Sequence, residues 1–489
     1  MEKKEYDIIF LGKGLKEYIL LSLLFKYPRI KKESLNPEDL KICQIISSKY
    51  KDESFFSLNI SQLFQKFNKN YIPEKYGDNK DWNIDFIPKI MLRNSPLIKI
   101  FLITEIYSYI EWKTIDQVYV YQYDQGGMFS SPKGILYKIP QNQDEIWNCD
   151  ILGIFEKNRC KKFYNYITNL IFSKNNEIKN TENIDINNIS FKTFSNNFNL
   201  DENTLDFIGH CIALYSDDNF LNNKAIDTIT RIKFYMENLT IPNNKNNNNG
   251  NNKLYYTTPF IFPIWGLQKI YKNYEREMYL YDYKSIDLDK DNDNFNDIEE
   301  IIFDENHKFK GIKTSKGERI YGKILISSPE YMLKFTDIKA QKKILRRIIV
   351  INNQFLPQNL QGDSCQIIVP KKQTGLKNDI FILKLSYGHC ICRKGYSVFF
   401  ISCWDDGREI DMQLKSVMDA LEINKNMADI FDIRDDYYEP NDLNFENNIF
   451  ISNSFLPQSH FEDDFDDIIN LFGKITDAKL QFDKLKSDK

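Results

Sequence analysis

The sequence predicts an α/β protein that has several sheets and a helical domain inserted between its two parts. Three observations predict this fold class. The chain opens with an apolar run, a turn with two glycines and a second apolar run, which is the order strand, turn, helix. Apolar residues then recur at helical spacing between about residues 141 and 240, and short strand patterns return after Gly266. At 489 residues the chain is too long for one ordinary core, so two domains are expected.

The opening segment predicts a large domain of the FAD/NAD(P)-binding type. Residues 6–11 form a predicted strand, Gly12 and Gly14 form a tight turn, and an apolar helix follows to about Phe25. Residues 41–46 are the next predicted strand. A strand, a glycine turn and a helix in this order open a dinucleotide-binding fold, in which the helix N-terminus binds the pyrophosphate.

Two other parts of the dinucleotide-binding fingerprint are absent from this sequence. The third glycine, which lets the helix pack close to the sheet, is replaced here by Glu17. The acidic residue that would bind the ribose at the end of the second strand is replaced by Ile46, which Ser47 follows. We therefore expect a retained fold that binds no cofactor. An FAD-dependent oxidoreductase is the alternative.

A helical domain is predicted in the middle of the chain. Apolar residues recur every three or four positions in three segments, 163–171, 205–215 and 226–239. Two asparagine-rich stretches, 175–188 and 243–252, are predicted to be disordered insertions. The expected boundaries are 1–140 for the first part of the large domain, 141–253 for the helical domain, 254–475 for the second part of the large domain and 476–489 for a tail.

Strand patterns separated by turn residues dominate the second part of the chain. These runs are rich in isoleucine, valine, phenylalanine and tyrosine, as half-buried or buried strands are. The predicted strands cover residues 301–303, 308–313, 319–321, 324–326, 367–369, 380–385 and 397–402.

Composition excludes several functional classes. The 65 basic and 69 acidic side chains nearly balance, which argues against a nucleic-acid-binding protein. The chain has no apolar run of about 18 residues that would span a membrane. Its eight cysteines include no C-x-x-C motif, and this use fits a reducing cytosol. Cys390 and Cys392 are expected at alternate positions of a buried strand rather than at a metal site.

The histidines predict no catalytic site. The four histidines lie at positions 210, 307, 389 and 460, and none belongs to an H-E-x-x-H motif. The sequence also lacks the G-x-S-x-G motif of a serine hydrolase. Each histidine is therefore expected to be structural or on the surface. Neither catalytic residues nor metal ligands are predicted.

Several motifs make the chain resemble one protein family. The most specific are D-W-N-I-D-F-I-P-K at 81–89 and S-C-Q-I-I-V-P at 364–370. Together with the opening segment, they resemble the Rab GDP dissociation inhibitors, and the likeness runs from about residue 5 to 475. Further matching segments in the same order are 155–159, 206–215, 228–233, 438–440 and 460–462.

The resemblance implies a flavoprotein-like large domain, a small helical domain and no enzymatic activity. It implies that the partners are prenylated Rab-family GTPases in the GDP-bound state, which the protein carries between membranes and cytosol. The protein is then expected to be a cytoplasmic monomer that contacts membranes transiently. A Rab escort protein, which presents Rabs to a prenyltransferase, and a diverged member with weakened Rab binding remain alternatives.

The resemblance also implies two sets of site residues. In the family, a platform on the large domain contacts the GTPase, and the candidates here are Tyr50, Lys51, Gln268, Glu275, Arg276 and Leu280. Tyr50 keeps the first aromatic residue of the family's platform, and Lys51 stands where the second belongs. Phe260 is the expected aromatic residue of a mobile loop. The expected lining of a prenyl pocket in the helical domain is Phe163, Ile167, Ile208, Ile212, Ile229 and Ile232.

Overall fold

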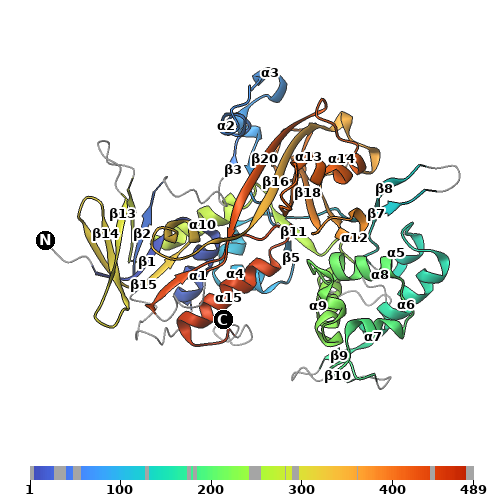
Figure 1. Ribbon diagram of the computed structural model, residues 1–489, viewed down its shortest axis with the longest axis horizontal. Coiled ribbons are helices and arrows are strands. Elements are labelled where there is room, and N and C mark those ends of the chain that lie inside the picture. The colour runs from blue at the N-terminus through green and yellow to red at the C-terminus, as the bar shows by residue number, and fades with distance from the viewer. Residues whose placement is uncertain are drawn as a thin grey trace.

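The molecule is elongated, with a large sheet at each end of its main body and the helical domain beyond the second sheet (Figure 1). The computed structural model describes residues 5–26, 40–47, 57–126, 131–141, 143–172, 178–179, 184–241, 255–280, 282–288, 297–360, 362–440 and 447–480. In these residues no helix is both long enough and apolar enough to span a membrane.

The first sheet has seven strands, and its centre is parallel. Strand β1 (Glu5–Leu11) lies between β2 (Lys41–Ile46) and β15 (Arg319–Ser327) and is parallel to both. Side chains of β1 alternate between two cores, which buries both of its faces and explains its continuous apolar run. The other strands are β12 (Asp282–Asp287), β13 (Ile298–Phe303), β14 (Phe309–Thr314) and β21 (Ile449–Ile451).

The predicted strands of this sheet are confirmed, with one correction. Residues 319–321 and 324–326, which were expected to form two strands, belong to the single strand β15. Its first residues pair with β14 and its last residues pair with β1 and β21. The polar residues between the two apolar runs therefore lie where β15 changes its pairing partner from β14 to β21, and they do not form a turn.

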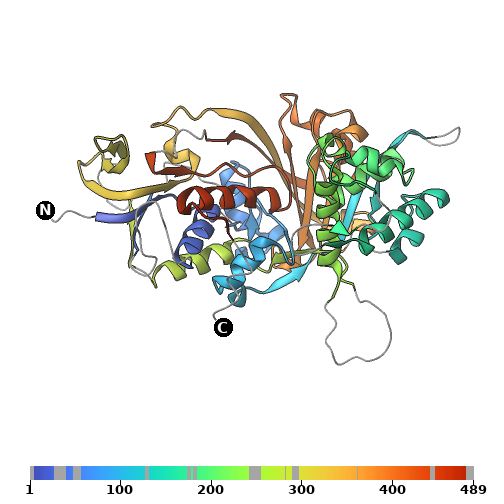
Figure 2. The same cartoon turned by 90° about the horizontal axis from the view of Figure 1, so that it is seen from below.

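Helix α1 (Leu15–Lys26) is the central helix of the large domain. Every residue from Leu15 to Phe25 is buried, including the charged Lys16 and Glu17. The helix contacts α4 (Pro96–Ile103), α10 (Gln268–Met278) and α15 (Glu462–Thr476). Figure 2 shows α15 lying across the sheet close to α1. The helix that follows the glycine turn is thus enclosed by protein on all sides.

The second sheet also has seven strands and is antiparallel except for the pair β7–β17. The strands predicted at 367–369, 380–385 and 397–402 are confirmed as β17 (Cys365–Val369), β18 (Ile380–Ser386) and β19 (Tyr396–Trp404). The sequence did not predict the remaining strands β7 (Gln117–Asp124), β8 (Lys133–Lys138), β16 (Ala340–Asn352) and β20 (Ala428–Tyr438).

The expected strand position of Cys390 and Cys392 is wrong. Both residues follow β18 in a tight turn, in which Cys390 has a left-handed backbone with φ of 55°. The backbone N–H of Cys390 donates to the carbonyl of Tyr387 at 2.9 Å. The alternation of apolar residues here therefore reflects a buried turn.

The helical domain is formed by consecutive helices between β8 and β11 (Phe260–Pro263) (Figure 1). The three predicted helical segments are confirmed, but the first helix ends at Asn169 and the second segment ends at Ile212. Gly209 lies in a π turn, and a Cβ there would come within 2.1 Å of the Phe220 ring, so the turn requires glycine. The helices are α5 (Gln143–Asn148), α6 (Ile154–Asn169), α7 (Phe191–Asn196), α8 (Glu202–Phe207) with the π turn (Ile208–Ile212), and α9 (Ala225–Leu239).

Candidate functional site

The glycine turn holds a carboxylate of the protein itself. The side chain of Glu17 is 2% exposed and folds back over the turn. A Cβ built on Gly14 would lie 1.5 Å from its Oε2 atom, and Ser452 Oγ donates to its Oε1. An internal carboxylate therefore occupies the positive end of α1, where a dinucleotide-binding fold places a pyrophosphate.

Tyr331 fills the space at the end of the second strand. Its hydroxyl accepts the Ser47 N–H at 3.0 Å and donates to the Ser47 carbonyl at 3.2 Å. Its ring lies 3.2 Å from the position that a Cβ on Gly12 would take. The ribose of a dinucleotide would need this space. The residues of the turn thus do not fit FAD or NAD.

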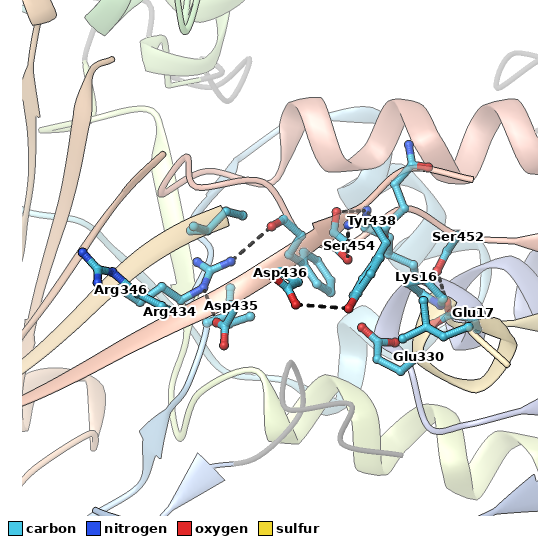
Figure 3. A pocket seen from close by; sticks show the side chains of 16 residues that line it. Lys16, Glu17, Glu330, Arg346, Arg434, Asp435, Asp436, Tyr438, Ser452 and Ser454 are labelled. Carbon is cyan, nitrogen blue, oxygen red and sulfur yellow. Dashed lines mark hydrogen bonds and ion pairs between the residues drawn. The ribbon is translucent and has the colours of Figure 1, made fainter. Parts of the chain in front are cut away.

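A polar cleft of about 400 Å³ remains beside this turn (Figure 3). Its cations lie close to carboxylates: Arg346 is 3.3 Å from Asp435, and Arg434 is 3.0 Å from Asp405. Burial raises the pKa of Glu330, at the edge of the cleft, to about 7, and the charge of Glu17 adds to this effect. The charged side chains that line the cleft are therefore largely neutralised by other side chains of the protein.

Asp85, from the D-W-N-I-D-F-I-P-K segment, positions helix α10. Its Oδ2 accepts the Leu267 N–H at 2.8 Å, and Ser57 donates to its Oδ1. Gly266 has φ of 75°, and a Cβ there would lie 2.5 Å from this carboxylate, so only glycine fits. Burial raises the pKa of Asp85 to about 6. The segment therefore fixes the point where α10 begins.

The predicted platform residues of α10 lie on its outer side. Gln268 and Glu275 are half-buried and Arg276 is exposed, whereas Ile270, Tyr274, Glu277 and Met278 form the buried side. Gln268 and Glu275 are seven residues apart and share one helix face. Leu280, just beyond the helix, is 81% exposed. Tyr50 and Lys51 lie outside the described residues, so their place beside α10 stays a prediction.

The six residues predicted to line a prenyl pocket are all buried in the large core that includes the helical domain. The ring of Phe163 packs against Phe191, Phe194 and Phe198. Of the six, Ile212 borders a cavity of about 170 Å³ at the junction of the two domains. The other five, Phe163, Ile167, Ile208, Ile229 and Ile232, are fully buried and do not line this cavity.

The junction cavity has one wall in each domain. The helical domain contributes Ile212, Ala213, Leu214, Arg231 and Phe234. The large domain contributes residues 92 and 95–97 around the start of α4, and 461–463, 465 and 466 around the start of α15. Pockets for organic ligands usually measure about 300–1,000 Å³, so this cavity is smaller than a usual ligand pocket.

The expected position of Phe260 on a mobile loop is wrong. Phe260 is the first residue of β11, which pairs with β5 (Met91–Leu92) and β6 (Trp112–Thr114). It is fully buried, with its ring 5.9 Å from that of Tyr235. The residues ahead of it, 242–254, lie outside the described residues.

A buried charge cluster joins the helical domain to the large domain. His210 of the π turn lies 3.3 Å from Asp218 and 2.9 Å from Asp379, and Asp379 belongs to the large domain. Lys372, also of the large domain, lies 3.3 Å from Asp206 and 3.2 Å from Asp218. The carboxylates that could hold a metal ion with His210 therefore already bind a lysine, and the cluster is best understood as an ionic link between the domains.

This link predicts a pH-dependent stability. Burial alone would lower the pKa of His210, but hydrogen bonds to Asp218 and Asp379 outweigh it and raise the pKa from 6.5 to about 10. A raised histidine pKa stabilises the fold fully below pH 6.5, and the stabilisation is lost as the pH rises through about 10. We expect the free energy of unfolding to fall by a few kcal/mol across this window, at about 1.4 kcal/mol per pKa unit.

The measurement is urea unfolding at a series of pH values for the wild type and His210→Gln. The difference between the two curves isolates His210 from other groups that titrate in the window. We expect this difference to shrink steadily as the pH rises from 6.5 towards 10. A difference that does not change with pH would show that His210 is neutral in the folded protein.

Sequence reasoning missed three parts of this site. It did not assign a role to Asp85 or His210, although both lie in motifs that it singled out. It also missed the contribution of α15 to the junction cavity. For His210 the sequence signal was a histidine inside the otherwise apolar run 207–214, which often marks a buried polar contact.

Comparisons with known proteins extend over both domains. The profile of the GDP dissociation inhibitor family matches residues 1–487. The chain is 29% identical to Rab GDP dissociation inhibitor beta of Rattus norvegicus over 489 residues, which cover 99% of this chain and 98% of the relative. It is also 29% identical to guanosine nucleotide diphosphate dissociation inhibitor 1 of Arabidopsis thaliana, over 98% of this chain and 96% of that protein.

Solved structures agree with this result. The crystal structure of Rab GDI from Plasmodium falciparum has a TM-score of 0.82 and 30% identity, with 98% of this chain and 100% of that chain covered. An oxidoreductase from Methanosarcina mazei, at 10% identity and a TM-score of 0.52 over 91% of this chain and 94% of that chain, shares the fold alone. The predicted fold class is confirmed. The chain belongs to the GDP dissociation inhibitor family.

Proposed function

We propose that this protein is a non-catalytic carrier of Rab-family GTPases. It binds the prenylated, GDP-bound form, slows GDP release and moves the GTPase between membranes and cytosol. It acts in the cytoplasm as a monomer that touches membranes transiently. The observation that carries this proposal is the similarity to proteins named Rab GDP dissociation inhibitor across the whole chain, including both domains.

The blocked glycine turn supports a binding role over a redox role. Glu17 and Tyr331 fill the positions that a pyrophosphate and a ribose would need. The family's fold is thus kept as a scaffold for α10 and for the junction of the domains. A GTPase that contacts α10 in one conformation of its switch regions would be bound selectively in the GDP state.

The junction cavity supports the proposal that the prenyl group binds between the two domains. An isoprenoid gains about 0.8 kcal/mol for each CH₂ that leaves water, so a carrier must offer comparable apolar burial. The cavity already has apolar walls from Ile212, Ala213, Leu214 and Phe234. At about 170 Å³ it must widen to hold a long chain, which requires the helical domain to move on the large domain.

Extraction from membranes tests the proposed function. Membranes that carry a prenylated Rab GTPase are loaded with GDP or with a non-hydrolysable GTP analogue, incubated with the purified protein and sedimented. We expect the GDP-bound GTPase to appear in the supernatant and the GTP-analogue form to stay on the membrane. Failure to release the GDP-bound form would refute the carrier role, and equal release of both forms would refute the nucleotide selectivity.

The outer side of α10 gives a specific prediction. Reversing the charge of exposed Arg276 by Arg276→Glu is expected to weaken binding of GDP-bound Rab by about tenfold, because a contact between opposite charges becomes repulsive. The measurement is a titration of fluorescent-GDP-loaded Rab. Lys415→Glu, at a position 72% exposed on α14 (Lys415–Ala420), is the matched control and should leave the affinity unchanged. Equal affinity of both variants would place the platform elsewhere.

A further inference from the structure

An exposed apolar surface with basic neighbours lies where α5 turns into α6. Ile154 and Phe155, the first two residues of α6, are 75% and 80% exposed, and Trp147 near the end of α5 is 43% exposed. Gly153 precedes them, and a Cβ there would meet no atom within 4 Å. We call Trp147, Ile154 and Phe155 the apolar tip.

Basic side chains of α6 flank the apolar tip. Lys157 Nζ donates to the Trp147 carbonyl at 2.9 Å, and Lys161 Nζ lies 5.4 Å from the centre of the Trp147 ring. Residues 154, 157 and 161 share one face of α6, because they are three and four positions apart. Trp147 therefore lies beside this face of α6, in contact with both lysines.

The neighbouring face of α6 is basic as well. Arg159 and Lys162 follow Phe155 by four and seven positions and are exposed. Two of the acidic groups near this region lie close to basic side chains. Glu156 is 3.1 Å from Arg159, and Glu145 lies 4.0 Å from Lys138, whereas Asp150, Asp201 and Glu202 are exposed. The exposed and half-buried charged side chains of α6 itself are therefore all basic, and its one acid, Glu156, is buried.

We propose that the apolar tip docks on the surface of an anionic lipid bilayer. A tryptophan ring is stable at the level of the lipid headgroups, while isoleucine and phenylalanine side chains enter the acyl boundary. Lysines and arginines beside them are attracted to anionic headgroups. Lysine is depleted from protein–protein interfaces, so two lysines in contact with the tip's tryptophan favour a lipid surface over a protein partner. This docking needs no GTPase and does not depend on the proposed function.

Vesicle sedimentation of the full chain, without GTPase, tests this inference. The protein is mixed with vesicles of phosphatidylcholine alone or of phosphatidylcholine with phosphatidylserine, at low and high salt. We expect binding to the phosphatidylserine vesicles that weakens at high salt. The double variant Ile154→Glu/Phe155→Glu should lower the partition coefficient by at least about tenfold. Lys157→Gln and Lys161→Gln should each lower it by about fivefold.

A second pair of exposed apolar residues provides the matched control. Leu102 is 54% exposed and Tyr109 is 65% exposed, both in the large domain. The double variant Leu102→Glu/Tyr109→Glu should bind the vesicles as the wild type does. Thermal melting of each variant checks that the fold is kept, which the exposure of all four positions leads us to expect.

Several outcomes would overturn the inference. These are no binding to phosphatidylserine vesicles, equal binding by the wild type and the Ile154→Glu/Phe155→Glu variant, or equal loss in the control. Binding to natural membranes but not to protein-free vesicles would indicate a protein partner instead. Because the assay contains no Rab GTPase, vesicle binding and GTPase extraction can fail independently of each other.

Discussion

Replacing Asp464 with alanine is expected to lower the free energy of unfolding by about 3–5 kcal/mol. The Asp464 carboxylate is 1% exposed and lies 3.3 Å from Lys16 and 2.8 Å from Lys89, which are themselves 2% and 1% exposed. Without this carboxylate, Lys89 keeps the carbonyls of Leu456 and Gln458 as hydrogen-bond acceptors but loses its counter-ion. A buried ammonium group without a counter-ion is costly, because burial opposes its charge.

The pKa of Lys89 shows how strongly this network depends on its acid. Burial lowers the pKa to about 8, although the nearby Asp464 opposes the shift. In Asp464→Ala, we expect Lys89 to lose its proton near neutral pH, which limits but does not remove the cost. The network ties α15 to α1 and to the D-W-N-I-D-F-I-P-K segment, so its loss should loosen the centre of the large domain.

Urea unfolding followed by circular dichroism measures this effect. Asp419→Ala is the control, since Asp419 pairs with Lys415 on the surface and is 63% exposed. Removal of such a pair costs about 0–1 kcal/mol. If the two variants unfolded at the same urea concentration, the buried network would contribute no more than a surface ion pair, and its role in holding α15 would be wrong.

Filling the junction cavity with Ala213→Leu is expected to weaken binding of prenylated Rab-GDP by about fiftyfold. Ala213 lines the cavity and is 1% exposed. Leucine adds three carbons, and each lipid carbon that they displace forfeits about 0.8 kcal/mol. Since the substitution fills an existing space of about 170 Å³, the melting temperature should stay close to that of the wild type.

Parallel titrations of prenylated and unprenylated Rab-GDP distinguish this effect from a general loss of binding. Unprenylated Rab-GDP should bind Ala213→Leu as it binds the wild type. Thr230→Leu places the same side chain on the exposed side of α9 and should affect neither titration. Equal losses for both forms of the GTPase would argue that the lipid is bound elsewhere. A large drop in melting temperature would mean that the cavity cannot accept the extra volume.

Local patterns in the sequence predicted most elements of the large domain that have regular apolar runs. Strand β16 was missed although residues 348–351 are a continuous apolar run. Its two arginines interrupt the pattern, yet both are buried. Arg347 is 2.6 Å from Asp432 and Arg346 is 3.3 Å from Asp435, both on the neighbouring strand β20. Such pairing depends on distant residues, so a local pattern cannot reveal it.

The site was predicted in its chemistry but not in its geometry. Glu17 stood out because a glycine was expected there, whereas its partner Ser452 lies 435 residues later and carries no signal of its own. In the helical domain, spacing predicted which side chains are buried. It could not predict that Ile212 alone among the candidates borders the cavity, because the opposite wall comes from α4 and α15.

The pairing of the first sheet also has a consequence for biosynthesis. Ile8 of β1 pairs with Ile324 of β15, and Leu325 of β15 pairs with Ile449 of β21. Strand β1 is therefore synthesised long before β15 and β21, and its sheet can close only after these later strands have been made. The helices of the helical domain all lie in one continuous stretch of the chain, residues 143–239. Contacts among them are therefore local in sequence and can form during synthesis. We expect the inserted domain to fold before the domain that carries it, while the apolar N-terminal strand and helix are bound by chaperones on the nascent chain.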